Sequence, residues 1–370
     1  MHIGLEFLAH LARDRLLGGF AVLGSTAWQG PERFVVGAMQ QDRVVVYGHA
    51  NDSIVEPSIS LIETNHHDAR RVLRMSHNGR VSGRDAIPAE LQSPQLKRLR
   101  NVQRLGTDRS GHASVDHVRH QLYVGRDLQT NGRALLKVTT RPGLVYEQNL
   151  VNEAAVLTTI NTELPAVRYF PLLLDHGRVR DGRMFVLMSF FDEWPLTTTI
   201  SEERRPDRLV GHLRTTLAVG AALAALHRIG IVHVDLNPMN ILYRADRGTP
   251  IIRIVDFESA YEIARHGKDV PYSPPTTTGF SAPEVSGHAP DGRADVFSLG
   301  AVLYTMIAGY QWTLGEELPA SIAAEREMDS DLQKILLTAV DRTPARRHQS
   351  VEIMCAAIEG YLESIWPARS

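Results

Sequence analysis

The amino-acid sequence predicts an α+β protein in which a strand-rich lobe is followed by a helical lobe, with a further α+β domain ahead of both. Three observations support this prediction. Strand-like segments with one helix among them occupy residues 101–191, helical periodicity dominates residues 192–370, and acidic and amide side chains gather near the border between these regions. Segregation of strands and helices along a chain is typical of α+β folds. We therefore expect two lobes with a cleft between them.

The N-terminal region, residues 1–87, is expected to form the separate α+β domain. Apolar spacing over residues 3–17 predicts an amphipathic helix. Strand-like runs are expected at residues 33–39, 43–49, 53–63 and 71–81. The polar, proline-bearing stretch 88–100 is typical of a linker, which favours a regulatory or docking role for the first domain over an extra packing layer.

Composition restricts the possible classes of function. The formal net charge of −2 gives no overall basic field, so nucleic-acid binding is not expected. The single cysteine excludes an intrachain disulfide and fits a reducing compartment. Charged residues interrupt the apolar N-terminus, so we expect a cytoplasmic protein without a targeting peptide or membrane anchor.

The motif with the most chemical information runs from His233 to Asn240 and reads H-V-D-L-N-P-M-N. A helix predicted over residues 209–229 precedes it, and Asp256 in the tripeptide D-F-E follows Asn240 by sixteen residues. Asp235 could accept a hydroxyl proton, while amide and carboxylate oxygens are ligands that suit Mg²⁺. A base, an amide and a second carboxylate beyond a short hairpin are the groups that magnesium-dependent phosphoryl transfer requires.

These residues resemble the eukaryotic-like (Hanks-type) serine/threonine protein kinase family, and the resemblance extends over about residues 115–365. It implies a bilobal protein-kinase-like fold with ATP and magnesium as cofactors. It also implies that Asp235 is the catalytic base and that Asn240 and Asp256 are magnesium ligands which also contribute to nucleotide binding. Asn237 occupies the place of the usual catalytic-loop lysine, where it could still donate a hydrogen bond.

The same resemblance assigns the residues that bind the phosphates. Residues 123–138 are similar to the second strand, turn and third strand of the small lobe, which places Lys137 at the phosphate-binding lysine. Glu153, in V-N-E-A-A-V-L, is expected to pair with Lys137. Glu147 is the alternative partner, but it lacks the apolar residues that follow Glu153.

The adenine site is assigned by the strand expected over residues 184–191. This strand is similar to the last small-lobe strand and would enter the hinge between the lobes. Met188 would then lie at the back of the adenine site, and Ser189, Phe190 and Phe191 would offer backbone groups to the base.

Three further matches favour protein kinases over their relatives. Residues 276–284 resemble the end of an activation segment, with Thr277 beside the catalytic base. Asp295 resembles the aspartate that braces the catalytic loop. Arg347 is expected to pair with Glu284 through two charge-assisted hydrogen bonds.

The sequence also departs from the family pattern. Counted without gaps from Lys137, the glycine-rich loop falls on residues 115–123, which contain no glycine. A longer hairpin would instead use residues 106–111, which begin and end with glycine. Glu258 replaces the glycine of D-F-G, and Val234 replaces the arginine before the catalytic aspartate, which makes switching by activation-segment phosphorylation doubtful.

Three functions remain open from sequence. The first is an ATP- and magnesium-dependent kinase acting on Ser or Thr hydroxyls of a protein substrate, with a possible docking partner for residues 1–87. The second is a pseudokinase that serves as a binding or scaffold module. The third is a small-molecule kinase of the choline or aminoglycoside type, which the residues at positions 237 and 258 resemble but the matches at Glu284 and Asp295 oppose.

Overall fold

The computed structural model divides the chain near residue 80 into two compact units. It describes residues 21–23, 36–40, 43–47, 91–105, 120–200, 206–246, 249–266, 279–286, 288–309 and 318–366. The kinase-like region lies in the second unit, and each unit is described by itself.

The first unit contains a small antiparallel sheet with the strand order β1-β2-β3. Its strands are β1 (Ala21–Leu23), β2 (Val36–Gln40) and β3 (Arg43–Tyr47). Strands β2 and β3 confirm the predicted pair joined through a short polar connection, whereas β1 was not expected. The predicted helix over residues 3–17 and the predicted strands at 53–63 and 71–81 lie outside the described residues.

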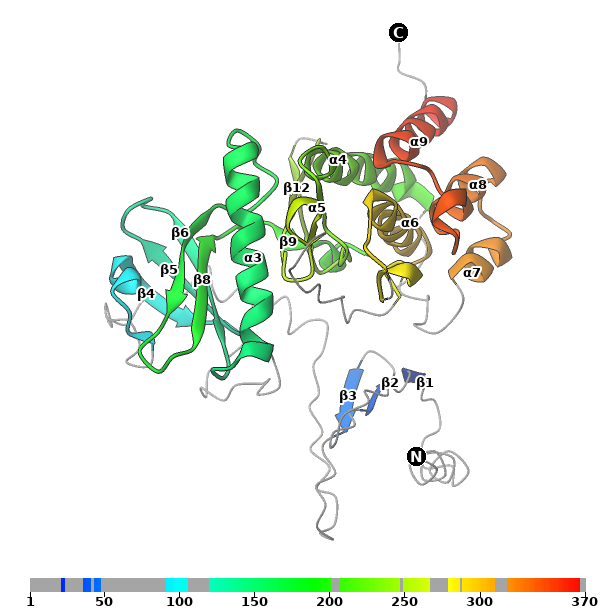
Figure 1. The fold of residues 1–370 in the computed structure, drawn as a ribbon. Helices are drawn as coiled ribbons and strands as arrows, with labels where there is room; N and C mark the ends of the chain where they lie inside the picture. Colours follow the sequence, from blue (N-terminus) through cyan, green and yellow to red (C-terminus); the bar gives the residue numbers. More distant parts are fainter. Residues whose placement is uncertain are drawn as a thin grey trace, which may run out of the picture. The chain divides into compact units, whose positions relative to one another are not determined.

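The second unit begins with a five-stranded antiparallel sheet of order β4-β5-β6-β8-β7. Its strands are β4 (Leu99–Arg104), β5 (His120–Asp127), β6 (Arg133–Thr139), β7 (Leu173–Arg178) and β8 (Met184–Ser189). Helix α3 (Leu144–Glu163) packs against β6, β7 and β8. Figure 1 shows this sheet with α3 beside it, separated from the helical group that contains α4 and α6 to α9.

The alternation of side chains along β6 determines which residues face α3. Ala134, Leu136 and Val138 are buried in a core on one face of the sheet. Leu135 packs into the other core, which includes α3 and the large lobe. Because successive residues of a strand point to opposite faces, Lys137 lies on the same face as Leu135. The strand periodicity therefore directs the Lys137 side chain toward the helix.

Residues of the predicted linker belong to the small lobe. Leu91, Leu96 and Leu99 are fully buried in the same core as Ala134, and the 3-10 helix η2 (Gln95–Arg98) leads directly into β4. The linker expected at residues 88–100 is therefore corrected from Leu91 onward. Proline and polar residues indicated an irregular backbone, which is compatible with a buried segment when leucines are spaced among them.

Helix α4 (Leu209–Arg228) lies at the centre of the large lobe and confirms the helix predicted over residues 209–229. It is long and apolar enough to cross a membrane by composition, but 56% of its most apolar window is buried inside the protein. The helix packs against α6 (Gly292–Ala308) and α9 (Val351–Ile365), which explains its apolar character.

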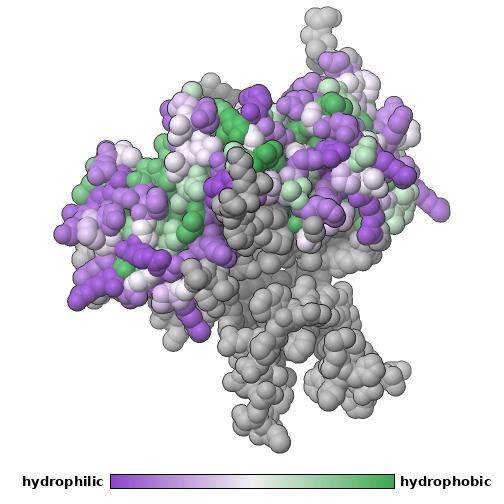
Figure 2. Space-filling view, in the orientation of Figure 1, coloured by the Kyte–Doolittle hydropathy of each residue, from purple (hydrophilic) through white to green (hydrophobic). Residues whose placement is uncertain are grey.

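Shorter elements complete this lobe. They are β9 (Trp194–Pro195), η3 (Leu196–Thr198), η4 (Pro206–Arg208), β10 (Ile231–Val232), β11 (Ile241–Asp246), β12 (Thr249–Ile254), β13 (Tyr261–Glu262), α5 (Ile263–His266), η5 (Pro283–Ser286), α7 (Leu318–Ala324), α8 (Ser330–Ala339) and η6 (Pro344–Arg346). The strands form two small antiparallel sheets, β12-β11-β9 and β10-β13. On the face of the molecule seen in Figure 2, the described surface is mainly hydrophilic and its apolar residues form small, separate patches.

Candidate functional site

The hairpin of β11 and β12 brings the two predicted magnesium ligands together. Ile241 pairs with Ile254, so Asn240 and Asp256 lie just beyond the same end of the hairpin. The amide of Val255 donates to the carbonyl of Asn240 at 3.0 Å, which fixes this neighbourhood. Residues sixteen positions apart thus become neighbours because a hairpin separates them.

The ring of Phe257 anchors the segment that follows. Phe257 is fully buried, and its ring centroid lies 5.9 Å from that of Phe170 and 5.1 Å from that of His233. Both ring pairs have an edge-to-face geometry, which suits the aromatic quadrupole. The apolar anchor holds the adjacent Asp256 in place, and the backbone there adopts a left-handed φ of 68°.

Asp295 at the start of α6 holds the catalytic loop from below, as the resemblance implied. Its carboxylate is fully buried and accepts hydrogen bonds from the backbone amides of His233 at 2.9 Å and Val234 at 2.8 Å. His227 Nε2 lies 2.8 Å from the same carboxylate. Burial alone would raise the pKa of Asp295, but the contact with His227 and the other hydrogen bonds outweigh it and lower the pKa. The charged carboxylate therefore fixes the backbone that presents Asp235.

The two amide side chains of the catalytic loop make different contacts. Asn240 Nδ2 donates to the carbonyl of Asp235 at 2.9 Å, which leaves the side-chain oxygen of Asn240 as the atom that could bind a metal ion. Asn237 Nδ2 donates to the same carbonyl at 3.0 Å, while its oxygen accepts from the amide of Met239 at 2.9 Å. Asn237 thus shapes the loop, and its role as a donor to substrate, through its second N–H, stays a prediction.

Lys137 lies at the centre of a cluster of acidic side chains. Its Nζ atom donates to Glu153 Oε2 at 3.0 Å, to Asp256 Oδ1 at 3.0 Å and to Glu258 Oε1 at 2.6 Å. His120 Nδ1 lies 2.9 Å from the same Glu258 oxygen. The structure therefore brings together the predicted lysine, its predicted glutamate and one predicted metal ligand, and adds Glu258 and His120.

Glu147, the alternative partner of Lys137, makes other contacts. It lies six residues before Glu153 on α3 and forms a bidentate pair with Arg178, at 2.7 and 2.8 Å. The Arg178 guanidinium and the amide of Gly143 lower the pKa of Glu147 to about 2. The geometry therefore supports Glu153 as the partner of Lys137.

Burial is the largest influence on the pKa values of the Lys137 cluster. Burial would lower the pKa of Lys137, but Asp256, Glu153 and Glu258 outweigh it and raise the pKa well above its ordinary value. Burial raises the pKa of Glu153 to about 7, with Asp256 and Glu258 adding to the effect. Burial would also raise the pKa of Glu258, but Lys137 and His120 outweigh it and hold it well below its usual range. The cluster thus contains more negative charge than Lys137 neutralises.

The predicted hinge residues lie where the sheet meets the large lobe. Met188 is buried and pairs with Leu135 of β6. The backbone amides of Ser189 and Phe190 donate to the carbonyls of Leu172 and Arg133, at 2.8 and 3.0 Å. These two amides are therefore engaged within the protein, and a base would have to use other backbone groups of the segment.

The glycine-free register for the phosphate loop lies partly on a strand. Strand β5 begins at His120 and pairs with both β4 and β6, so residues 120–123 are part of the sheet and not of a loop. The connection between β4 and β5 contains Gly106 and Gly111, as the longer hairpin requires, and it lies outside the described residues. Which residues of this connection would cover the phosphates stays a prediction.

One of two further matches near the substrate side can be compared with the structure. Arg347 donates to both carboxylate oxygens of Glu284 at 2.7 Å, which confirms the predicted bidentate pair. The predicted activation-segment residue Thr277 lies outside the described residues.

Asn152 is a site residue that the sequence did not reveal. It precedes Glu153 on α3, and its Nδ2 lies within hydrogen-bonding distance of the carbonyls of Phe257, Glu258 and Ala260, at 3.4, 3.0 and 2.9 Å. An isolated asparagine in a helix gives no signal of its own, since the partners are more than a hundred positions away. Glu258 could have been found, because it was a visible departure from the family pattern.

The donor set fits a hard divalent cation. Asp256 offers a carboxylate whose side chain is 40% exposed, and Asn240 offers an amide oxygen beside it. Oxygen ligands of this type, few in number, suit Mg²⁺ that is also bound by phosphates. When bound, the ion would neutralise charge on the phosphates.

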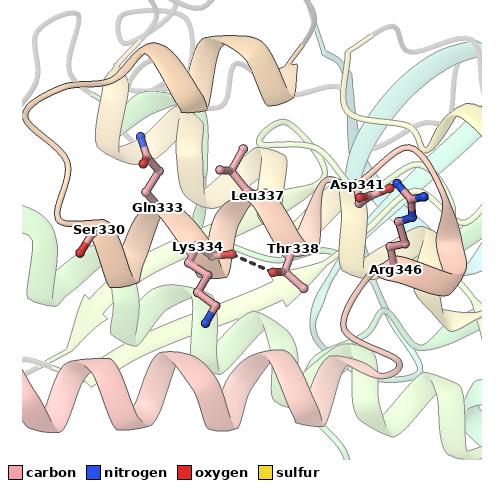
Figure 3. A pocket seen from close by; sticks show the side chains of 7 residues that line it. All are labelled: Ser330, Gln333, Lys334, Leu337, Thr338, Asp341 and Arg346. Carbon is pink, nitrogen blue, oxygen red and sulfur yellow. Dashed lines mark hydrogen bonds between the residues drawn. The ribbon is translucent and has the colours of Figure 1, made fainter.

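A separate hollow in the large lobe has a volume of about 310 Å³. It lies over α8 and the following turn (Figure 3) and is lined by Ser330, Gln333, Lys334, Leu337, Thr338, Asp341 and Arg346. The hydrogen bond of 2.8 Å from Thr338 Oγ1 to the carbonyl of Lys334 is internal to the helix. None of the predicted site residues contributes to this hollow.

The strand-rich lobe with its lysine–glutamate pair and the braced catalytic loop of the helical lobe place the chain in the class of two-lobed proteins with the kinase fold. Residues 124–357 match the family model described as the protein kinase domain. The chain belongs to this family.

Individual relatives agree with this assignment. The chain is 28% identical over 311 residues to the serine/threonine-protein kinase Pkn1 of Myxococcus xanthus, covering 76% of this chain and 41% of Pkn1. It is 32% identical over 151 residues to PknB of Mycobacterium tuberculosis, covering 36% of this chain and 24% of PknB. It is similar in structure to the kinase domain of Mycobacterium tuberculosis PknI, with a TM-score of 0.53, 21% identity, and 74% of this chain and 99% of that chain covered. The chain thus spans less than half the length of these two curated relatives.

Proposed function

We propose that the chain is an ATP- and magnesium-dependent kinase that phosphorylates Ser or Thr hydroxyls of a protein substrate. The observation that carries this proposal is the contact of Lys137 with both Glu153 and Asp256 at 3.0 Å, because it aligns a phosphate-binding ammonium with a metal-binding carboxylate. The family membership supports a protein substrate.

Each residue then has a defined part in the reaction. Asp235 accepts the proton of the substrate hydroxyl while the hydroxyl oxygen forms a bond to the γ-phosphorus of ATP. The bond between the γ-phosphorus and the β,γ-bridging oxygen breaks, which releases ADP. Lys137 holds phosphate oxygens, and Glu153 orients Lys137. Asn240 and Asp256 would hold the magnesium ion. Catalysis of this type depends mainly on positioning and charge neutralisation.

The test is transfer of label from ATP to a mixed protein substrate in the presence of magnesium. Asp235→Asn keeps the size of the side chain but removes the base, so we expect the rate to fall by about 10²–10⁴-fold. Asp246→Asn is the matched control, because Asp246 is exposed at the far end of β11, and it should act like the wild type. Equal rates for wild type and Asp235→Asn would refute the enzyme proposal.

The pseudokinase alternative is favoured by one observation. Glu258 lies 2.6 Å from Lys137 Nζ and thus competes for the ammonium that phosphates would use. A thermal-shift titration with ATP, with and without magnesium, measures binding independently of turnover. Stabilisation without label transfer would favour a binding module, and label found only on a small metabolite would favour a small-molecule kinase.

A further inference from the structure

The carboxylate of Glu258 is the feature of the site that the kinase reaction does not use. It stands two residues after Asp256, where the sequence resemblance expects glycine. Its Oε1 lies 2.6 Å from Lys137 Nζ and 2.9 Å from His120 Nδ1, and its Oε2 accepts from Asn149 Nδ2 at 3.5 Å. With a side chain only 13% exposed, Glu258 is a built part of the lysine site and not a solvated surface group.

Counting charges around Lys137 shows what Glu258 adds. Glu153, Asp256 and Glu258 each place a carboxylate oxygen within 3.0 Å of the single ammonium. Among the described side chains, the basic groups that pair with these carboxylates are Lys137 and His120. Three carboxylates thus converge on one ammonium, which leaves an excess of negative charge to which Glu258 contributes.

This excess acts directly on a nucleotide. A triphosphate is itself strongly negative, so without a cation it must approach Lys137 against the charge of the cluster. The catalytic loop does not compensate, because Asn237 supplies no positive charge where the family usually has lysine. A divalent cation bound to the phosphates would cancel the repulsion. Glu258 therefore weakens mainly the binding of nucleotide that carries no metal ion.

We propose that Glu258 makes nucleotide binding conditional on a divalent cation, so that metal-free nucleotide is rejected and metal-bound nucleotide is accepted. This inference rests on the proposed function, since it requires a nucleotide at Lys137.

Direct metal binding by Glu258 is the competing explanation. Oxygens of Glu153, Asp256 and Glu258 lie within 4.8 Å of one another, close enough for a shared ion. However, the Lys137 ammonium already occupies the point on which they converge. The geometry therefore favours Glu258 as a counter-ion of Lys137, and only direct metal binding predicts that loss of Glu258 weakens the binding of metal-bound nucleotide.

The experiment measures the dissociation constant of a non-hydrolysable ATP analogue by calorimetry, once with a chelator and once with excess magnesium, at constant pH and ionic strength. The readout is the ratio of the metal-free to the metal-bound constant. Glu258→Gln removes the charge but keeps the shape, so the ratio should fall on the order of tenfold, through tighter metal-free binding. Glu258→Gly should change the ratio in the same direction. It provides a second measurement of the effect if Glu258→Gln fails to fold.

Two controls separate charge from packing. Glu258→Asp keeps the charge and should retain the wild-type ratio. Glu147→Gln removes a carboxylate of α3 that pairs with Arg178, and it should also leave the ratio unchanged.

Two outcomes would overturn the proposal. An unchanged ratio in both Glu258→Gln and Glu258→Gly would show that the charge does not set metal dependence. Weaker binding of the metal-bound analogue alone would make Glu258 a metal ligand. Absence of binding by the wild type with magnesium would instead refute the proposed kinase function, and this inference with it.

Discussion

Replacing Asp295 with asparagine tests how the catalytic loop is held. Asp295 Oδ1 accepts from the amide of Val234 at 2.8 Å, and Oδ2 accepts from the amide of His233 at 2.9 Å and lies 2.8 Å from His227 Nε2. Asparagine has one acceptor oxygen and one NH₂ group. Whichever way it is oriented, the NH₂ group of Asp295→Asn faces at least one buried N–H donor.

The cost follows from these contacts. In the less damaging orientation, the oxygen keeps the contacts of His233 and His227 and the amide of Val234 loses its acceptor. A hydrogen bond to a charged group contributes about 1.5–3 kcal/mol, and a buried N–H without an acceptor costs about 1–3 kcal/mol more. We therefore expect a loss of about 2.5–6 kcal/mol in the free energy of unfolding. Activity should fall as well, because Val234 has a left-handed φ of 69° that this contact helps to hold.

The assay is urea unfolding of the wild type and Asp295→Asn at one pH, with the free energy taken from the midpoint and slope. Asp291→Asn is the matched control, since Asp291 caps the same helix by accepting from the amide of Arg293 at 2.9 Å. Asparagine is an equally good N-cap, and the exposed ion pair of Asp291 with Arg293 contributes little, so this variant should change stability by less than about 1 kcal/mol. A loss below about 1 kcal/mol for Asp295→Asn would refute the reasoning.

Three further predictions concern stability. Arg347→Lys should lower the free energy of unfolding, measured by thermal unfolding, by about 2–3 kcal/mol, because lysine cannot form the two contacts of 2.7 Å with Glu284. Adding Glu284→Gln to this variant should cost little more, and additive losses of stability would contradict the prediction. Burial would raise the pKa of Asp127, but hydrogen bonds from the side chains beside it outweigh burial and lower the pKa to about 2, below the unfolded value. Ionised Asp127 should therefore add about 2 kcal/mol to the free energy of unfolding above about pH 4, and this contribution should disappear toward pH 2. Urea unfolding of Asp127→Asn should therefore differ from the wild type at about pH 5 but not near pH 2, and a constant difference would count against it. Gly220→Ala should destabilise the large lobe by about 1–3 kcal/mol, because the new Cβ would lie 2.3 Å from Cys355 Sγ, and Cys355→Ala should restore stability; failure of that rescue would exclude the clash as the cause.

The parts of the site that the sequence revealed are those with a fixed local spacing. Asp235 and Asn240 belong to one short loop, and a single hairpin carries the chain from there to Asp256. Lys137 and Glu153 lie on a strand and the helix that follows it, and the resemblance to the family implied that they pair. In each case few intervening residues leave few possible geometries.

The parts that the sequence did not reveal depend on distant contacts or on loop length. The approach of His120 to Glu258 joins residues more than a hundred positions apart, and no local pattern encodes it. The length of the hairpin between β4 and β5 is likewise independent of the strand pattern, because longer surface loops cost little additional entropy. Leu91 and Leu96 were expected in a linker, but they are buried in the core of the small lobe. Their neighbours in the sequence do not indicate this, because burial depends on the sheet against which they pack.

The position of Asn152 has a consequence for the kind of small molecule that this chain can accept. Its side-chain amide lies within hydrogen-bonding distance of the carbonyls of Phe257, Glu258 and Ala260. An outward displacement of α3 would therefore leave those carbonyl oxygens without these hydrogen bonds. A compound that displaces α3 must break these contacts, whereas one that binds with α3 in its observed position leaves them intact. Inhibitor screens against this protein should therefore favour compounds of the second kind.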